Sequence, residues 1–135
     1  MEKNMKYILM MPCTVAGMKT FGAWPKEDLM AHIAFMIDLN KQLTASGNFV
    51  SAEGLAGPDQ AKLVRSGPNG EPITDGVYPE SKEYLAGYWI VDVETPEQAY
   101  AIAARASAAP GLGGKPMSIP IEVRQIMSGP PPDLV

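Results

Sequence analysis

Two runs of almost continuous apolar residues dominate the hydrophobic pattern of the chain, at residues 6–11 and 85–93. Such runs are typical of strands that are covered on both faces, whereas a strand with one face in water alternates in polarity. Pro12 ends the first run, and we expect a loop between it and Pro25. The pattern therefore predicts two central strands of one sheet.

Residues 25–46 show helical periodicity instead. Glu27 and Asp28 fall in the expected first turn, and Gly47 provides a stop signal. The expected core face of this helix carries apolar residues at helical spacing, namely Leu29, Ile33, Met36, Ile37 and Leu43.

A second helix is expected to begin at Thr95, whose hydroxyl suits a helix cap. Pro96 then takes the first helical position, Gln98 completes the start signal, and the helix ends before Pro110. Its expected core stripe consists mostly of small side chains that allow close approach to a sheet, namely Ala99, Ile102, Ala103 and Ala106.

Three other segments complete the pattern. Residues 49–57 mix apolar and polar side chains and predict a second, less buried strand that ends in a turn at Pro58-Asp59. Residues 61–65 and 72–74 flank Asn69-Gly70, which tolerates positive φ, so they predict a protruding hairpin. Residues 119–124 alternate in polarity and include Pro120, which cannot donate to a ladder, so this strand is expected at a sheet edge.

The expected order is βαββαβ with a hairpin inserted before the third main strand. This is the order of a ferredoxin-like α+β fold, whose sheet order 4-1-3-2 puts the two apolar runs at the centre. Two helices cover only one face of such a sheet. Apolar residues of the other face, among Tyr7, Leu9, Tyr88 and Ile90 or their neighbours, then need another cover. We expect a homodimer that packs sheet against sheet as an α+β barrel.

Size and charge narrow the class of protein. A chain of 135 residues with 46% hydrophobic content suits one compact domain, which we expect at residues 1–127, followed by a proline-rich tail at 128–135. The formal net charge of -4 argues against nucleic acid as a partner. With no leader and no long apolar run, neither a membrane partner nor export is expected, so we expect a cytoplasmic protein in which Cys13 is a buried, inert thiol.

The candidate chemistry centres on His32, the one histidine of the chain. Imidazole is the side chain best suited to proton transfer near neutral pH, although a lone histidine beside an apolar helix face is often structural. Asp75 precedes Gly76, so it either caps its own turn or serves as a carboxylate that orients the imidazole. We expect His32 as the general acid/base and Asp75 as its partner.

Four further residues are candidates for ligand binding, each with a plainer alternative. Glu53 is either an edge-strand charge in water or a pocket carboxylate. Glu80 and Lys82 belong either to a solvated charge cluster or to a site for a polar substrate group. Tyr78 either binds a ligand or fills core or interface, and the second alternative applies to Trp89 as well. One histidine and one cysteine make no zinc site, and no nucleotide-binding loop has the required context, so no cofactor or metal is expected.

Several separate segments, spread over roughly residues 5–127, carry a family resemblance: 6–11, His32 with Phe35, 51–55, Asp75-Gly76 with 80–83, 87–93 and 121–124. In their order and spacing they resemble the DGPF-domain branch of the YCII-related superfamily of small α+β proteins. Val77 and Tyr78 replace the proline and phenylalanine of its Asp-Gly-Pro-Phe signature.

The resemblance implies a dimeric α+β barrel and, in related proteins, a histidine paired with an aspartate near a late Asp-Pro step. Here that region reads Ala108-Ala109-Pro110, without the aspartate. The function we expect is binding of an unidentified small molecule, with isomerase-like or hydrolase-like proton transfer by His32 and Asp75. The alternative is a non-catalytic ligand-binding or regulatory partner protein of a transcription-regulatory system.

Overall fold

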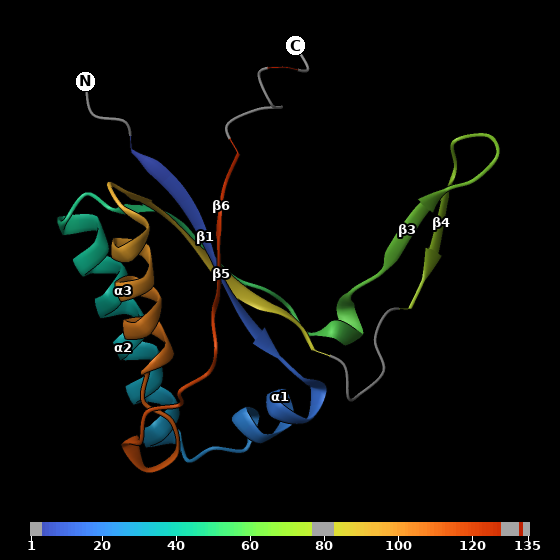
Figure 1. Cartoon of the computed structure of the whole chain (residues 1–135). Helices are drawn as coiled ribbons and strands as arrows, with labels where there is room; N and C mark the ends of the chain where they lie inside the picture. The colour runs from blue at the N-terminus through green and yellow to red at the C-terminus, as the bar shows by residue number, and fades with distance from the viewer. Residues whose placement is uncertain (1–3, 77–82, 128–132, 134–135) are drawn as a thin grey trace.

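The computed structural model describes residues 4–76, 83–127 and 133 of the chain, which form a mixed α+β fold (Figure 1). In chain order its elements are β1 (Met5–Cys13), α1 (Val15–Gly22), α2 (Lys26–Ala45), β2 (Phe49–Gly54), the 3-10 turn η1 (Pro58–Gln60), β3 (Leu63–Ser66), β4 (Pro72–Asp75), β5 (Tyr84–Val93), α3 (Pro96–Ser107), the 3-10 turn η2 (Leu112–Gly114) and β6 (Glu122–Gln125).

The main sheet is antiparallel and has the order β2-β5-β1-β6, while β3 and β4 form a separate two-stranded sheet. With the hairpin set aside, this is the predicted ferredoxin-like order 4-1-3-2. The two apolar runs therefore become the central strands, as their composition predicts.

The register of the central strands separates the two faces of the sheet. Leu9 lies opposite Trp89, and both belong to the buried core under α2 and α3, which lie together on one side of the sheet (Figure 1). Ile8 lies opposite Ile90, one residue along, and so faces the other side. Tyr7 is also in the core.

Of the candidates for the uncovered face, Tyr7 and Leu9 lie in the core instead, and their neighbours on β1 take that face, because alternation alone does not tell which parity faces the helices. The residues that share the uncovered face with Tyr88 and Ile90 are Ile8 and Met10. We call this set of four the open face.

Helix α2 has the predicted bounds within one residue at each end, and its predicted core stripe is confirmed in part, because Leu43 is buried and Met36 packs against the core. Leu39 and Leu43 are buried, whereas Ile33 and Ile37 are 53% and 52% exposed. Two apolar stripes run side by side on this helix, and periodicity does not decide which one meets the sheet. Contact with the core runs mainly through the C-terminal half of the helix.

Helix α3 agrees with the sequence at its start and on its buried face. Thr95 accepts a hydrogen bond from the Gln98 backbone N–H at 3.3 Å, and Pro96 is the first helical residue. The buried residues are the predicted small stripe of Ala99, Ile102, Ala103 and Ala106. Small side chains let this helix approach β1 and β5 closely.

The segment expected to be a loop before Pro25 contains helix α1, so that expectation was wrong. Thr14 caps the helix by accepting from the Gly17 backbone N–H at 3.0 Å. Two glycines and a threonine give α1 a weak intrinsic propensity, which hid it from the sequence pattern. Strand β1 also runs past Pro12 to Cys13, because a register shift between Met11 and Pro12 lets the strand accommodate a proline.

The edge strands are shorter than predicted. Strand β2 ends at Gly54 rather than at residue 57, and β6 begins at Glu122 rather than at residue 119. Both are edge strands of the sheet, as expected. Residues 77–82 and most of the tail at 128–135 lie outside the described residues.

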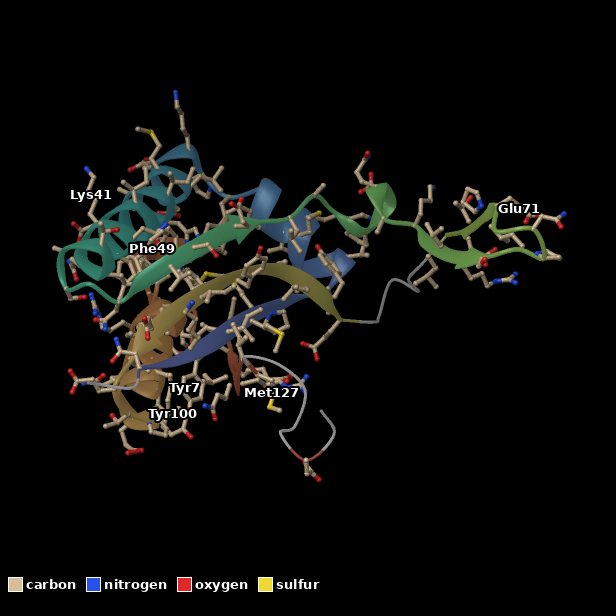
Figure 2. All side chains as sticks on the ribbon, turned by 90° about the horizontal axis from the view of Figure 1, so that it is seen from above. Tyr7, Lys41, Phe49, Glu71, Tyr100 and Met127 are labelled. Carbon is tan, nitrogen blue, oxygen red and sulfur yellow. The ribbon has the colours of Figure 1, made fainter. Side chains whose placement is uncertain are left out.

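The predicted hairpin is present as β3 and β4, and it projects away from the body of the molecule (Figure 1). Figure 2 shows Glu71 at its far end. Leu63 and Val64 in its first strand are 55% and 61% exposed. A two-stranded ribbon alone is marginally stable in water, so this hairpin depends on its own cross-strand contacts in the single chain.

The core and the hairpin should respond differently to the same substitution. Leu9→Ala opens a cavity at a fully buried position and should lower the free energy of unfolding by about 2–5 kcal/mol. The matched change Leu63→Ala on the exposed hairpin should alter it by only about 0.5 kcal/mol. Urea unfolding monitored by circular dichroism measures both, and equal losses would contradict this assignment of the core.

Candidate functional site

His32 is held by a backbone carbonyl from a distant part of the chain. Its Nδ1 lies 3.1 Å from the carbonyl oxygen of Pro110. A carbonyl oxygen only accepts hydrogen bonds, so Nδ1 carries the proton of this bond. In the neutral imidazole, Nε2 is then the unprotonated nitrogen, able to accept a hydrogen bond or a proton.

The loop that presents Pro110 is tied down at several points. Asp28, one turn before His32 on α2, accepts a hydrogen bond from the Gly113 backbone N–H at 3.2 Å. Across the same loop, Met117 N donates to Ala109 O at 2.9 Å. These bonds hold the loop against the start of α2 and place the Pro110 carbonyl beside the imidazole.

Two aromatic rings from the end of α1 and the residues after it pack edge-on against His32. The ring centroids of Phe21 and Trp24 lie 5.3 Å and 5.9 Å from the imidazole, with interplanar angles of 74° and 86°. Phe21 and Trp24 also contact each other at 4.8 Å. Edge-to-face contacts of this kind are favourable and directional. Together with the Pro110 bond they fix the plane of the imidazole.

His32 lies where two cavities meet. Cavity A, of about 540 Å³, lies against α1 and the start of β5. Cavity B, of about 390 Å³, lies between α2 and the β2–β5 part of the sheet. The residues that line both are Met11, Phe21, His32 and Ala86. The volumes of both cavities fall in the range of small-molecule sites. Because His32 lines both, either cavity could bring a ligand next to this residue.

Cavity B is built on one stripe of α2. His32, Met36 and Asn40 recur at every fourth residue, so they lie on one face of the helix, and all three line the cavity. Asn40 Oδ1 accepts a hydrogen bond from the Trp89 indole Nε1 at 2.8 Å. This bond leaves the amide nitrogen of Asn40 as a donor for a ligand.

Cys13 and Tyr84 are also among the residues that line cavity A. Cys13 is half-buried, and its Sγ donates to the Thr14 carbonyl at 3.2 Å, so the expectation of a buried thiol is met only in part. Tyr84 is 7% exposed. Burial raises the pKa of Tyr84 to about 12, assisted by its hydrogen bond with Cys13 and by the charges of Cys13 and Asp59.

The structure does not bring the two predicted catalytic residues together within one chain. Asp75 is the last residue of the hairpin strand β4, where its carboxylate lies 3.7 Å from Arg65 Nε and is 56% exposed. It lines neither cavity. The Pro110 carbonyl takes the place at Nδ1 that the sequence suggested for a carboxylate.

The predicted ligand-binding residues divide between the cavity and the undescribed segment. Glu53 is exposed and is among the residues that line cavity B, but in the strand register it lies opposite Tyr88 and so shares a sheet face with Tyr88 rather than with Trp89. Trp89 is buried in the core and contributes to the wall of the same cavity. Tyr78, Glu80 and Lys82 lie outside the described residues.

Sequence reasoning missed the residues that shape the site around His32. Phe21 and Trp24 fell in a segment expected to be a loop, although Thr14 was a possible helix cap. Asn40 could have been found from the sequence, because it lies eight residues after His32 and so on the same face of the predicted helix. The Pro110 carbonyl gave none, because a backbone acceptor has no residue signature.

Among the described residues, no group of three or more histidine, cysteine or acidic side chains is placed to hold a metal ion. Over the same part of the chain, no helix has the length and apolar character needed to cross a membrane.

The family model of the YCII-related domain matches residues 5–113, which is most of the chain. The protein belongs to the YCII-related family. The match includes His32, the cavity-lining strands β1, β2 and β5, and the Pro110 region. No curated protein matches the sequence. The family thus agrees with the fold, and the chemistry has to be argued from the site.

The raised pKa of Tyr84 makes a prediction about stability at alkaline pH. The folded state keeps the phenolic proton up to about pH 12, while an unfolded tyrosine loses it near pH 10, so between these values unfolding releases a proton. The contribution of Tyr84 is full below pH 10, and the free energy of unfolding should fall by about 1.4 kcal/mol per pH unit from pH 10 to 12.

Urea unfolding at pH 9 to 12, compared between the parent protein and Tyr84→Phe, isolates this contribution. The parent should lose more stability than the variant over this range. The absorbance of tyrosinate near 295 nm should also lose its latest-titrating component in Tyr84→Phe. Parallel stability curves for the two proteins would show that Tyr84 is not titrating abnormally.

Proposed function

We propose that the protein binds a small organic molecule in cavities A and B and that His32 Nε2 exchanges a proton with it. The observation that carries the proposal is the oriented imidazole at the junction of the cavities. Its Nδ1 is committed to Pro110, its plane is fixed by Phe21 and Trp24, and its second nitrogen is left for a ligand. General acid/base groups require this kind of positioning.

The reaction class would be cofactor-independent proton transfer, such as an isomerisation or a hydrolytic step. The side-chain amide of Asn40 is a polar group of cavity B available to orient a substrate, and we keep Glu53, Tyr78, Glu80 and Lys82 as proposed contributors. We also place the chain in the DGPF branch on its Asp75-Gly76 signature, and in the cytoplasm.

A non-catalytic binding protein, for instance a regulatory partner in a transcription-regulatory system, is the second candidate. One observation favours it. The chain has Ala109-Pro110 where relatives are thought to carry the aspartate partner, and the carboxylate of Asp75 pairs with Arg65 instead. A neutral carbonyl orients the imidazole but stabilises its protonated form less than a carboxylate does.

Proton exchange with solvent separates these two functions. Fragments found by ligand-observed NMR should be incubated with the protein in D₂O, and loss of their acidic C–H signals should be followed. With His32 as the acid/base, His32→Asn should slow this exchange about 100-fold to 10,000-fold. Asparagine keeps a side-chain N–H that can donate to Pro110 while it removes Nε2.

Leu63→Ala on the hairpin is the control variant and should exchange at the parental rate. Fragments that bind but exchange equally slowly with the parent protein, His32→Asn and buffer would favour the non-catalytic function. The proposal would be refuted if the NMR screen found no fragment whose binding is lost or weakened in His32→Asn.

We also propose that the open face is covered by a second copy of the chain, giving the dimeric α+β barrel. Ile8, Met10, Tyr88 and Ile90 form an apolar centre on this face. Next to them Arg124 pairs with Glu122 across 3.7 Å on the edge strand β6. An apolar centre with a charged margin suits a self-complementary interface.

Ile90→Asp should disrupt this dimer, because it buries an unpaired charge against the partner. Light scattering after gel filtration should give the mass of two chains for the parent protein and of one chain for the variant. Val64→Asp, on the exposed hairpin, is the matched control and should remain dimeric. A parent protein that elutes as a monomer would rule out this cover of the open face.

A further inference from the structure

The wall of cavity A is dominated by soft and aromatic side chains. Besides Phe21 and Trp24, it is lined by the three methionines Met11, Met18 and Met117. Methionine is flexible and polarisable and packs favourably against aromatic rings, and the edges of Phe21 and Trp24 suit a flat π-system. With a volume of about 540 Å³, the cavity has room for a ligand of one or two fused rings.

Most polar side chains of this cavity are already engaged within the chain. Thr14 accepts from Gly17 N, and the Thr20 hydroxyl donates to the Ala16 carbonyl at 3.0 Å. Cys13 donates to the Thr14 carbonyl and interacts with Tyr84. Among the described residues, none makes a hydrogen bond to His32 Nε2, which makes this atom the natural partner for a polar group of the ligand.

The orientation of His32 decides what kind of group that is. Because Nδ1 carries the proton for the Pro110 bond, Nε2 of the neutral ring is an acceptor. The ligand must therefore offer a donor, such as a hydroxyl or an N–H. A group that only accepts hydrogen bonds, such as an ether or a ketone, would face the lone pair of Nε2 and form no hydrogen bond with it.

The charge of the lining argues against an acidic ligand. Glu83 is an acidic residue of the lining, and of the described residues that line cavity A none is lysine or arginine. A carboxylate or phosphate buried among these described residues would lose its hydration and find no cationic partner among them, which is costly. An uncharged molecule avoids this cost.

We infer that cavity A binds an uncharged, planar aromatic compound whose hydroxyl or N–H group donates a hydrogen bond to His32 Nε2. This inference rests on the proposed function and adds the chemical class of the ligand. It commits to phenol-like, indole-like or aromatic amide-like molecules rather than to organic acids or phosphorylated metabolites.

Three probes of similar shape test this class. They are 2-naphthol, which is neutral and has a donor, 2-methoxynaphthalene, which lacks the donor, and 2-naphthoate, which is an anion. Cys13 is the one cysteine of the chain and lines cavity A, so protection of its thiol from iodoacetamide, followed by mass spectrometry, reports occupancy without any enzymatic assay.

The parent protein should bind 2-naphthol about twofold to tenfold more tightly than 2-methoxynaphthalene, as expected for one net hydrogen bond. It should bind 2-naphthoate more weakly than either. The ¹⁵N signal of His32 Nε2 should be that of an unprotonated ring nitrogen and should move when 2-naphthol binds. Because there is one histidine, that signal needs no assignment.

Two variants make the result specific. His32→Asn should abolish the preference for 2-naphthol while 2-methoxynaphthalene still protects Cys13. Ala86→Leu, which fills space beside the imidazole, should weaken both probes without changing the His32 tautomer. Far-ultraviolet circular dichroism and alkylation without probe check that each variant is folded.

The ligand class is overturned if 2-naphthoate protects Cys13 best, if the two neutral probes protect equally in the parent protein, or if none of the three protects it. These outcomes leave the proposed function standing when the fragment screen still finds binders that depend on His32. The proposed function fails separately, when that screen finds none.

Discussion

The packing of α2 against the sheet through its C-terminal half is the constraint on which the rest of the structure depends. Leu39 and Leu43 are almost fully buried and belong to the same core cluster as Leu9 and Trp89 of the central strands. The N-terminal half carries His32 and stands next to cavities rather than core. One helix therefore supplies both the rigidity and the functional side chain, which is a sound arrangement for a precise site.

The imidazole of His32 is held firmly in one orientation, but by uncharged groups. A backbone carbonyl and two aromatic edges fix the ring, yet no carboxylate of the described residues lies within ion-pair distance of it. Such a histidine accepts a hydrogen bond well and accepts a proton with less assistance than in a His–Asp pair. A neutral, donor-bearing ligand fits this electrostatic setting better than an anion, so the proposed ligand class and the proposed chemistry share one physical origin.

The two uncovered features of the single chain have different physical character. The open face is an apolar surface on the rigid central strands, where burial against another surface removes apolar area from water. The hairpin β3–β4 is a thin ribbon with its charged pair Arg65–Asp75 in solvent and few contacts to the body. Stability of the fold is thus concentrated in the sheet and its two long helices.

The sequence by itself determined the elements whose local signals agree with their burial. The two apolar runs, the capped start of α3 with its small stripe, and the Asn69-Gly70 hairpin all follow from period, cap and turn chemistry. These signals are local, because each depends on a few neighbouring residues.

Only the tertiary structure decided the parity of β1 on the sheet, the stripe of α2 that is buried and the existence of α1 as the wall of a cavity. It also gave His32 its partner, a carbonyl 78 positions away, in place of the aspartate that sequence reasoning chose. The physical reason is that every backbone carbonyl is an equal candidate acceptor in the sequence, and the folded chain alone selects which one meets the imidazole.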